Sequence, residues 1–167
     1  PSVYNVSIAF RVDRYLAPER VSRALERLVA AHEVLRARLV EQDGEPGFVL
    51  DASPASSGLE LLVGDSADLQ AVVLRPFDLE RGPLWRAALH HVAATSVVVL
   101  VVHHIVLDRN AEYILLRDLA TALADPGMAL PTRDYDFFDL SNYECQRLAS
   151  EQAVLERQLV GVERREL

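Results

Sequence analysis

The chain has 167 residues, half of them hydrophobic and a quarter charged, which is the composition of one globular domain or one lobe. A chain of this length can bury a core without disulfides, and its single cysteine, Cys145, fits a reducing cytoplasm. The net charge of −8 argues against a nucleic-acid partner, because no basic stripe exists to displace counterions from phosphates. The longest apolar run, Ser96 to Val102, is far shorter than the roughly 20 residues of a membrane-spanning helix. We therefore expect a cytoplasmic protein that binds neither membrane nor nucleic acid.

The amino-terminal part of the chain predicts a strand followed by a helix. From Tyr4 to Val12, apolar residues alternate with polar or small ones, which is typical of a strand with one buried face. A helix is expected from Pro18, which suits a first helical turn, to about His32. Its apolar residues recur at helical spacing and predict one buried side. They are Val21, Ala24, Leu25, Leu28 and Val29.

The next segment predicts a β-hairpin. Two strands, Leu35 to Glu41 and Phe48 to Asp51, flank the turn-forming residues 43–47 (DGEPG). After a loop rich in Ser and Pro at 52–58, a short strand is expected from Leu59 to Val63. A helix over 67–74 follows, with residue 65 or 66 (Asp or Ser) as its cap.

The second half of the chain predicts two strands and three helices. Strands are expected from Leu84 to Val92 and from Val97 to His103. The latter has no polar alternation, which indicates a central strand covered on both faces. Helices are expected over Asn110 to Leu123, Tyr135 to Leu148 and Ser150 to Leu167. The inner side of the first of these carries Ile114, Leu115, Leu119 and Leu123. Strands mixed with helices predict a layered sheet with helices packed on it.

Two adjacent histidines, His103 and His104, end the most hydrophobic strand, and Asp108 lies shortly before the next helix. Catalytic groups often occupy such a strand end, because the sheet fixes the backbone while the side chains face a cleft. Adjacent strand residues point to opposite faces, so only one of the two histidines can face a given cavity. An imidazole titrates near neutral pH and can orient an amine, accept its proton or stabilise a tetrahedral intermediate.

On spacing alone, other interpretations stay open. A histidine pair beside a strand is more often a hydrogen-bonded structural feature than a catalytic one. A zinc site of His103, His104 and Asp108 is disfavoured, because no second cluster with ligand spacing follows. A second pair, His90 and His91, follows a strand of ordinary character and is expected at the surface. The chain has neither a Gly-x-Ser-x-Gly nucleophile motif nor a glycine-rich phosphate loop.

Four short segments follow one another in a fixed order: 31–38 (AHEVLRAR), 75–79 (RPFDL), 82–84 (GPL) and 103–108 (HHIVLD). Together they resemble the core motifs of condensation domains from nonribosomal peptide synthetases. Those motifs are Arg-His-x-x-Leu-Arg-Thr-x-Phe, Pro-Phe-Asp-Leu followed by Gly-Pro-Leu, and His-His-x-x-x-Asp. The turn at 43–46 and the tail at 155–159 are also similar to the corresponding parts of these domains.

The resemblance implies that residues 1–167 form the amino-terminal lobe of a condensation domain. The implied fold is α/β (α+β), a two-layer sandwich like chloramphenicol acetyltransferase, with a mixed β-sheet flanked by helices. Two such lobes form a V with a tunnel between them, and carrier proteins insert phosphopantetheine arms from opposite mouths. The acceptor amine attacks the donor thioester and produces an amide and a thiol. No metal and no cofactor other than these arms is implied.

The resemblance also implies residue roles. The catalytic second histidine corresponds to His104, the supporting first histidine to His103, and the structural aspartate to Asp108. We expect Asp108 to pair with Arg36 of the second motif, because a carboxylate can meet a guanidinium with two hydrogen bonds.

Departures from the family pattern bear on activity. The first core segment, Ser-x-Ala-Gln-x-Arg, and the carboxy-terminal lobe are absent, so we expect a piece of a longer polypeptide that is inactive alone. The glycine that usually follows the aspartate is Arg109 here, and a glycine allows a backbone shape or a close approach that a side chain hinders. Arg109 can pair with Glu112 across the first helical turn. Alternatively, its guanidinium crosses the tunnel and modulates activity by blocking the acceptor arm, or Arg109 is an exposed residue without consequence for activity.

Three functions therefore stay open. The first is amide formation in antibiotic or other secondary metabolism, with peptidyl or acyl carrier proteins and neighbouring synthetase domains as partners. The second is a catalytically impaired, condensation-like module that recruits other proteins, which Arg109 favours and the intact His104 and Asp108 oppose. The third is a related acyltransferase that forms esters, since nothing in the sequence separates amine from hydroxyl acceptors.

Overall fold

A computed structural model describes residues 2–42, 44–51, 59–62, 66–131 and 137–158. The chain divides into two compact units, Pro1–Thr132 and Arg133–Leu167, and each is described by itself. The strands of the first unit are β1 (Asn5–Val12), β2 (Ala37–Gln42), β3 (Glu45–Leu50), β4 (Leu59–Leu62), β5 (Trp85–Val92) and β6 (Thr95–His103). Its helices are α1 (Pro18–Ala31), α2 (Ser66–Leu74) and α3 (Arg109–Ala124), with 3-10 turns at η1 (Ser2–Tyr4), η2 (Glu33–Arg36) and η3 (His104–Val106). In the second unit the structure describes the helix α4 (Phe137–Gln158).

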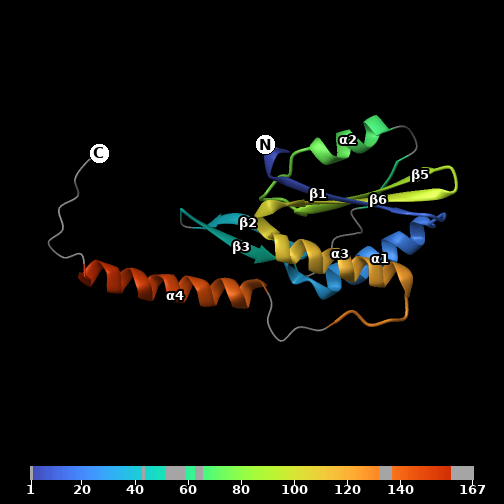
Figure 1. The fold of residues 1–167 in the computed structure, drawn as a ribbon. Coiled ribbons are helices and arrows are strands. Elements are labelled where there is room, and N and C mark those ends of the chain that lie inside the picture. Colours follow the sequence, from blue (N-terminus) through green and yellow to red (C-terminus); the bar gives the residue numbers. More distant parts are fainter. Residues whose placement is uncertain (1, 43, 52–58, 63–65, 132–136, 159–167) are drawn as a thin grey trace. The chain divides into compact units, whose positions relative to one another are not determined.

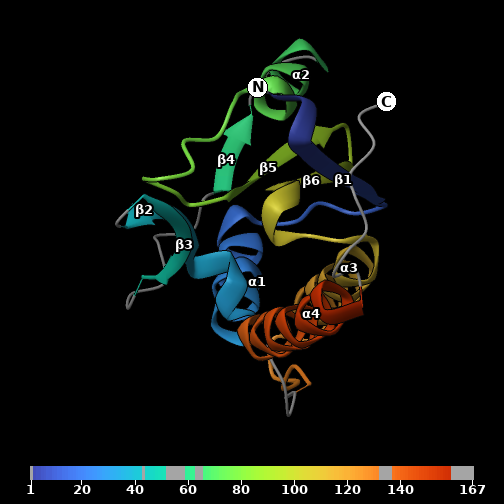
Figure 2. The same cartoon turned by 90° about the vertical axis from the view of Figure 1, so that its left-hand side faces the viewer.

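Strand β6 lies inside the main sheet, whose order is β1-β6-β5-β4. It runs antiparallel to both neighbours, while the edge strand β4 runs parallel to β5, so the sheet is mixed. Figures 1 and 2 show α2 over one face of the sheet and α1 with α3 over the other. All side chains from Val98 to Val102 are buried. The prediction of a central strand covered on both faces is confirmed, and so is the α/β class.

The alternation of side chains along β6 gives the core two parts. Val99 and Val101 pack with Val72 of α2 and Ala88 of β5 in one buried cluster. The intervening residues, such as Leu100, point to the opposite face, on which α1 and α3 lie. Each fully buried Val or Leu side chain contributes about 1.5–3 kcal/mol, so the strand is stabilised only when both faces are covered.

Helices α1 and α3 bury the sides that their sequence spacing predicts. The five apolar residues of α1 that recur at helical spacing are all buried, and the helix is followed by its C-cap residue, His32. In α3, Leu115, Leu119 and Leu123 are buried and Ile114 is half buried. The burial of these two helices therefore follows from periodicity alone.

The hairpin differs from its predicted position in both strands. Leu35 belongs to η2 and not to a strand. Strand β3 begins at Glu45, so Pro46 and Gly47 lie in the strand and not in the turn. The proline is tolerated because β3 pairs only with β2 among the described residues, so no other strand needs a backbone donor at Pro46. The turn is confined to the neighbourhood of Gly44, whose φ of 83° suits a glycine.

Other boundaries also differ from the prediction. Tyr4 lies in η1 and is exposed, so it does not take part in the alternation of β1. Helix α4 has 22 residues and runs through Ala149, where the sequence analysis places a break between two helices. No glycine or proline occurs between residues 137 and 158, so nothing in the local sequence interrupts the helix. The predicted loop at 52–58 and residues 159–167 lie outside the described residues.

Two arginines of α1 hold the carboxyl end of α3. Arg20 donates from Nε and Nη2 to the carbonyl oxygen of Leu123 at 2.9 and 2.6 Å, and from Nη2 to Ala124 at 3.0 Å. Arg27 donates to the carbonyl oxygen of Asp125 at 3.1 Å. The last carbonyl groups of a helix have no partner within it, and a cation near them also interacts favourably with the helix dipole. These contacts fix α3 against α1.

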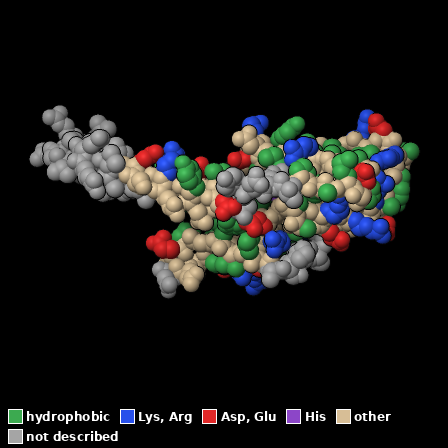
Figure 3. All heavy atoms as spheres, turned by 90° about the horizontal axis from the view of Figure 1, so that it is seen from below, with side chains coloured by type: hydrophobic (Ala, Val, Ile, Leu, Met, Phe, Trp, Pro, Cys, Tyr) green, Lys and Arg blue, Asp and Glu red, His purple; other side chains and the backbone are tan. Residues whose placement is uncertain are grey.

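The surface of the α1–α3 layer is mixed in character. Figure 3 shows arginine and acidic side chains interspersed with hydrophobic ones, and not gathered into one charged patch.

All 17 positively charged residues of the chain are arginines. Among the helices that the structure describes, none combines the length and hydropathy of a membrane span.

Arg20→Ala should lower the free energy of unfolding by about 1–3 kcal/mol, because carbonyl groups at the end of α3 lose their donor. In urea unfolding the midpoint should fall while the m-value is unchanged. Arg23→Ala is the matched control, since Arg23 is exposed on the same helix and has no hydrogen bond or ion pair among the described residues. Equal midpoints for the two variants would contradict the role of Arg20.

Candidate active site

The histidine motif lies where the central strand ends. His103 is the last residue of β6, His104 begins η3, and Asp108 is the N-cap residue of α3. The sheet therefore fixes one end of the motif and a helix fixes the other. Only the short turn between them carries His104.

His103 is buried and hydrogen-bonded to its surroundings. Its side chain is 9% exposed, and its backbone N–H donates to the carbonyl oxygen of Leu84 at 2.9 Å. Its ring Nδ1 accepts a hydrogen bond from the backbone N–H of Ile105 at 3.2 Å, so His103 caps η3. Burial lowers the pKa of His103 below the ordinary value of 6.5. His103 thus favours its neutral form, which is the form that can accept this hydrogen bond.

His104 is exposed, in contrast to its neighbour. Its imidazole makes no hydrogen bond or ion pair with any residue that the structure describes. Its backbone carbonyl oxygen accepts from the N–H of Leu107 at 3.3 Å, which closes the turn. The opposite environments of the two histidines agree with the prediction that only one of them can face a given space. Of the two imidazoles, only that of His104 is exposed to solvent.

The predicted ion pair between Arg36 and Asp108 is wrong. Asp108 Oδ1 accepts from the backbone N–H of Ala111 at 2.7 Å, which caps α3. Arg36 Nη1 donates to the carbonyl oxygen of Asp51 at 3.3 Å, and its Nε is buried without a partner. An N-cap aspartate finds a backbone donor within its own helix, so the local hydrogen bond replaces the remote one. Asp108 still holds the motif, but through the helix.

Arg109 is the first residue of α3 and is exposed. Its predicted pairing with Glu112 is not formed, because Arg109 has no hydrogen bond or ion pair within the described part of the chain. Among described residues other than glycine, only Ala93 has a positive φ, so the backbone of Arg109 does not need a glycine. The difference from the family pattern therefore concerns the side chain and its charge.

The Pro-Phe-Asp segment touches the motif directly. The ring of Phe77 meets the ring of His103 edge to face, at 6.1 Å between centroids and 88° between planes. The carboxylate of Asp78 accepts from the backbone N–H groups of Glu80 and Arg81, both at 3.1 Å, and so closes the turn that follows. This segment, which the sequence analysis uses only for the resemblance, therefore supports the histidine motif.

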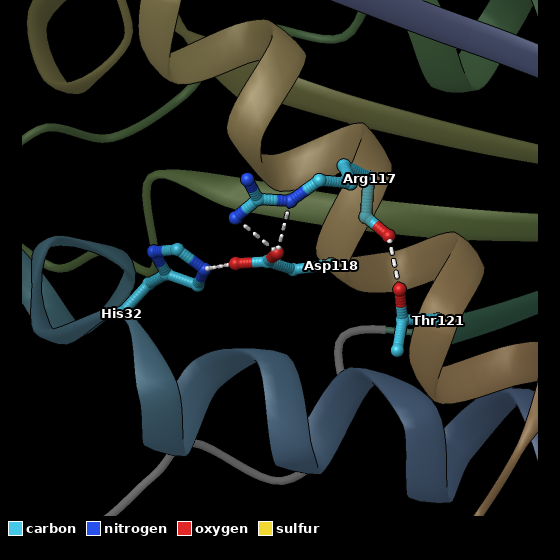
Figure 4. Close-up of polar contacts among 4 residues, drawn as sticks. All are labelled: His32, Arg117, Asp118 and Thr121. Carbon is cyan, nitrogen blue, oxygen red and sulfur yellow. Dashed lines mark hydrogen bonds and ion pairs between the residues drawn. The ribbon is translucent and has the colours of Figure 1, made fainter. Parts of the chain in front are cut away.

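A polar cluster around the buried carboxylate of Asp118 joins the second motif to α3, as Figure 4 shows. His32 Nε2 lies 2.9 Å from Oδ2 of Asp118, whose residue is 0% exposed. Arg117 donates from Nε and Nη2 to the other carboxylate oxygen at 2.9 and 2.8 Å. Asp118 was not predicted from the sequence, although it lies among the buried positions of α3, Leu115, Leu119 and Ala122. The cluster ties the end of α1 to the middle of α3.

The second histidine pair is not at the surface, contrary to the prediction. His90 and His91 lie within β5, and His90 is 7% exposed. His91 Nδ1 lies 3.1 Å from the hydroxyl oxygen of Ser96, and its ring stacks on Tyr15 with a centroid distance of 4.3 Å. Both histidines belong to the packing of the β5–β6 hairpin. Among the described residues, no group of three His, Cys, Asp or Glu side chains is arranged to hold a metal ion.

The family model of the condensation domain matches residues 1–157. The chain therefore belongs to the condensation-domain family. Its fold is the chloramphenicol acetyltransferase-like fold of that family, as the sequence analysis predicts.

Relatives and solved structures support this membership. The nonribosomal peptide synthetase criC of Aspergillus cristatus is 31% identical over 84% of this chain, which spans 6% of that protein. The phosphinothricin tripeptide synthetase PhsC of Streptomyces viridochromogenes is 35% identical over 82% of this chain, which spans 14% of it. The X-domain from teicoplanin biosynthesis has a TM-score of 0.74 and 26% identity, covering 89% of this chain and 35% of that one.

Asp118→Ala should lower the free energy of unfolding by about 3–5 kcal/mol, because it removes a buried carboxylate and leaves its donors without an acceptor. Urea unfolding of the chain measures the change. Glu26→Ala serves as the control, since Glu26 is an exposed carboxylate of α1 without a partner among the described residues. A loss below about 1 kcal/mol for Asp118→Ala would mean that the cluster adds little to stability.

Proposed function

We propose that this chain forms the amino-terminal lobe of a condensation domain that joins a donor acyl or aminoacyl thioester to an acceptor amine. Both substrates are tethered to carrier proteins, and His104 acts on the acceptor amine. The observation that carries the proposal is the exposed imidazole of His104, which no described residue engages, on a turn held from both sides. Membership of the condensation-domain family supports the reaction class.

The reaction needs one well-placed group that can handle a proton. The acceptor nitrogen attacks the carbonyl carbon of the thioester, so a C–N bond forms and the C–S bond breaks. The nitrogen loses a proton, and the leaving thiolate gains one. An imidazole can orient the amine, or hold the proton between these two events, at neutral pH. The fixed backbone around His104 supplies the orientation, because a misplaced group contributes little.

The substrates arrive on phosphopantetheine arms, so the proposal assigns no directly bound cofactor to this chain. Under this proposal the rest of the condensation domain provides the other wall of the tunnel. This division is supported by the solved X-domain, of which the chain covers 35%. The carrier proteins and neighbouring synthetase domains are partners in the cytoplasm under this proposal.

His104→Ala in the complete condensation domain should lower the rate of amide formation by ~10²–10⁴-fold, because the proton then moves without a positioned group. The assay follows the amide product from two loaded carrier proteins. Arg23→Ala, on the outer side of α1, should leave the rate unchanged. An unchanged rate for a folded His104→Ala domain would remove His104 from the mechanism.

A second candidate function is recruitment of other proteins by a catalytically impaired domain. Arg109 favours it, because its exposed guanidinium, which has no partner among the described residues, lies at the start of α3, five residues after His104. A positive charge beside the reacting amine would disfavour any cationic intermediate. In one solved structure the X-domain from teicoplanin biosynthesis is in a complex with OxyB. The fold is therefore compatible with both functions.

Arg109→Ala and Arg109→Gly separate the two candidates in the complete domain. If the charge impairs catalysis, both variants should form amide about tenfold faster than the wild type, equivalent to ~1.4 kcal/mol in the barrier. The alanine variant removes the charge without loosening the first turn of α3, so it isolates the electrostatic effect. A wild type that is already fast, and that neither substitution accelerates, would exclude impairment.

A further inference from the structure

The turn that carries His104 depends on the side chain of His103. Ile105, the residue directly after His104, donates its backbone N–H to Nδ1 of His103. A ring nitrogen accepts a hydrogen bond only when it carries no proton, so the bond requires the tautomer with its proton on Nε2. A side chain that fixes the orientation of the His103 ring therefore also fixes the backbone conformation of the turn that carries His104.

Phe77 is in contact with the His103 ring and is itself held in place. The guanidinium carbon of Arg86 lies 3.9 Å from the centroid of the Phe77 ring, so a cation covers the face of that ring. The Phe77 ring meets His103 nearly at a right angle, 6.1 Å away. The ring of Tyr4 lies 6.0 Å from His103. Aromatic groups thus limit the rotation of His103 about its χ2 angle.

Arg86 is anchored in turn by the carboxyl end of α2. It is 6% exposed, and it donates from Nε to the carbonyl oxygen of Val72 at 2.9 Å and from Nη2 to that of Arg75. Asn5 donates to the same carbonyl of Arg75 at 2.9 Å and is the β1 residue directly opposite His103. The end of α2, Phe77 and the end of β6 therefore form one connected unit.

We propose that Phe77 and Arg86 are positioning residues for the condensation reaction: they orient His103 as the hydrogen-bond acceptor that fixes the turn carrying His104. This inference rests on the proposed function of His104. Neither residue touches the reactants, and Arg86 acts through Phe77, which acts through His103. The role is separate from burial, because it depends on which atom of His103 faces Ile105.

Substitutions at His103 test the hydrogen bond itself in the complete condensation domain. Asparagine places its amide oxygen near the position of Nδ1 and can accept from Ile105, whereas leucine cannot accept. His103→Leu should lower kcat by ~10–100-fold with KM for the acceptor-loaded carrier unchanged, because a misplacement of about 1 Å carries a penalty of this size. His103→Asn should stay within about threefold of the wild type. Equal losses for the two variants would overturn the proposal.

Phe77→Leu tests the support of the ring, and Phe10→Leu is its matched control. Phe10 is also a half-buried phenylalanine, but it lies opposite Val98, away from the motif. Phe77→Leu should lower kcat by about tenfold at constant KM, while Phe10→Leu should lower only stability. If Phe77→Leu does not fold, Arg86→Lys replaces it, since an ammonium cannot reproduce the planar fork. A kcat unchanged in the folded variant would contradict the proposal.

Nitrogen-15 spectra of histidine report the same interaction without turnover. The wild-type domain should show His103 with an unprotonated, hydrogen-bonded Nδ1, and Phe77→Leu should shift this signal toward a mixture of tautomers. A protonated Nδ1 in the wild type would overturn the inference even if His104 is catalytic. Conversely, a fully active His104→Ala domain would refute the proposed function and leave the spectral result intact, so the two failures can be told apart.

Discussion

The structure depends on the burial of both faces of the central strand, β6. Strand β6 buries Val98 to Val102, and a strand points its side chains to both faces of the sheet. Both faces must therefore be covered by helices, and the covering helices are short. Helix α2 has only 9 residues and α3 has 16, and helices of this length owe most of their stability to tertiary packing. The protein consequently has to hold the ends of its covering helices, where the backbone carbonyl groups lack partners.

Arginine supplies those missing partners on both faces. Arg20 and Arg27 reach the end of α3 from α1, and Arg86 reaches the end of α2 from β5. A guanidinium has five donors in a fixed plane, so one side chain can serve several carbonyl groups that point in similar directions. The chain has no lysine, and an ammonium in these places would act as a single point of charge. The same chemistry that secures the layers also places Arg86 over Phe77, beside the motif.

Periodic features were predictable from the sequence, and long-range polar contacts were not. The buried residues of α1 and the central place of β6 follow from spacing, because backbone geometry alone decides which side chains share a face. The supposed pair of Arg36 and Asp108 failed because a closer backbone donor competes for the carboxylate. Asp118 was missed because a polar residue within an apolar stripe gives no sign of the partner that a remote segment brings. Alternation along the strand could not tell which histidine is exposed, because β6 is buried on both faces and His104 lies in the turn that follows it. Only the resemblance to the family motif selected His104.

The contrast between His103 and His104 limits how this segment can change in length. His103 is the last buried residue of β6, and the next residue, His104, is exposed and begins η3. One residue inserted before His103 would move His103 to the exposed place, and one residue deleted there would bring His104 into the buried end of the strand. In either case the acceptor for Ile105 or the exposed imidazole would be lost. Among the described residues, the β2–β3 hairpin pairs with no third strand, so a change of length beside its turn shifts the register of no other strand. Length variation among relatives should therefore accumulate at that turn and be absent between β6 and α3.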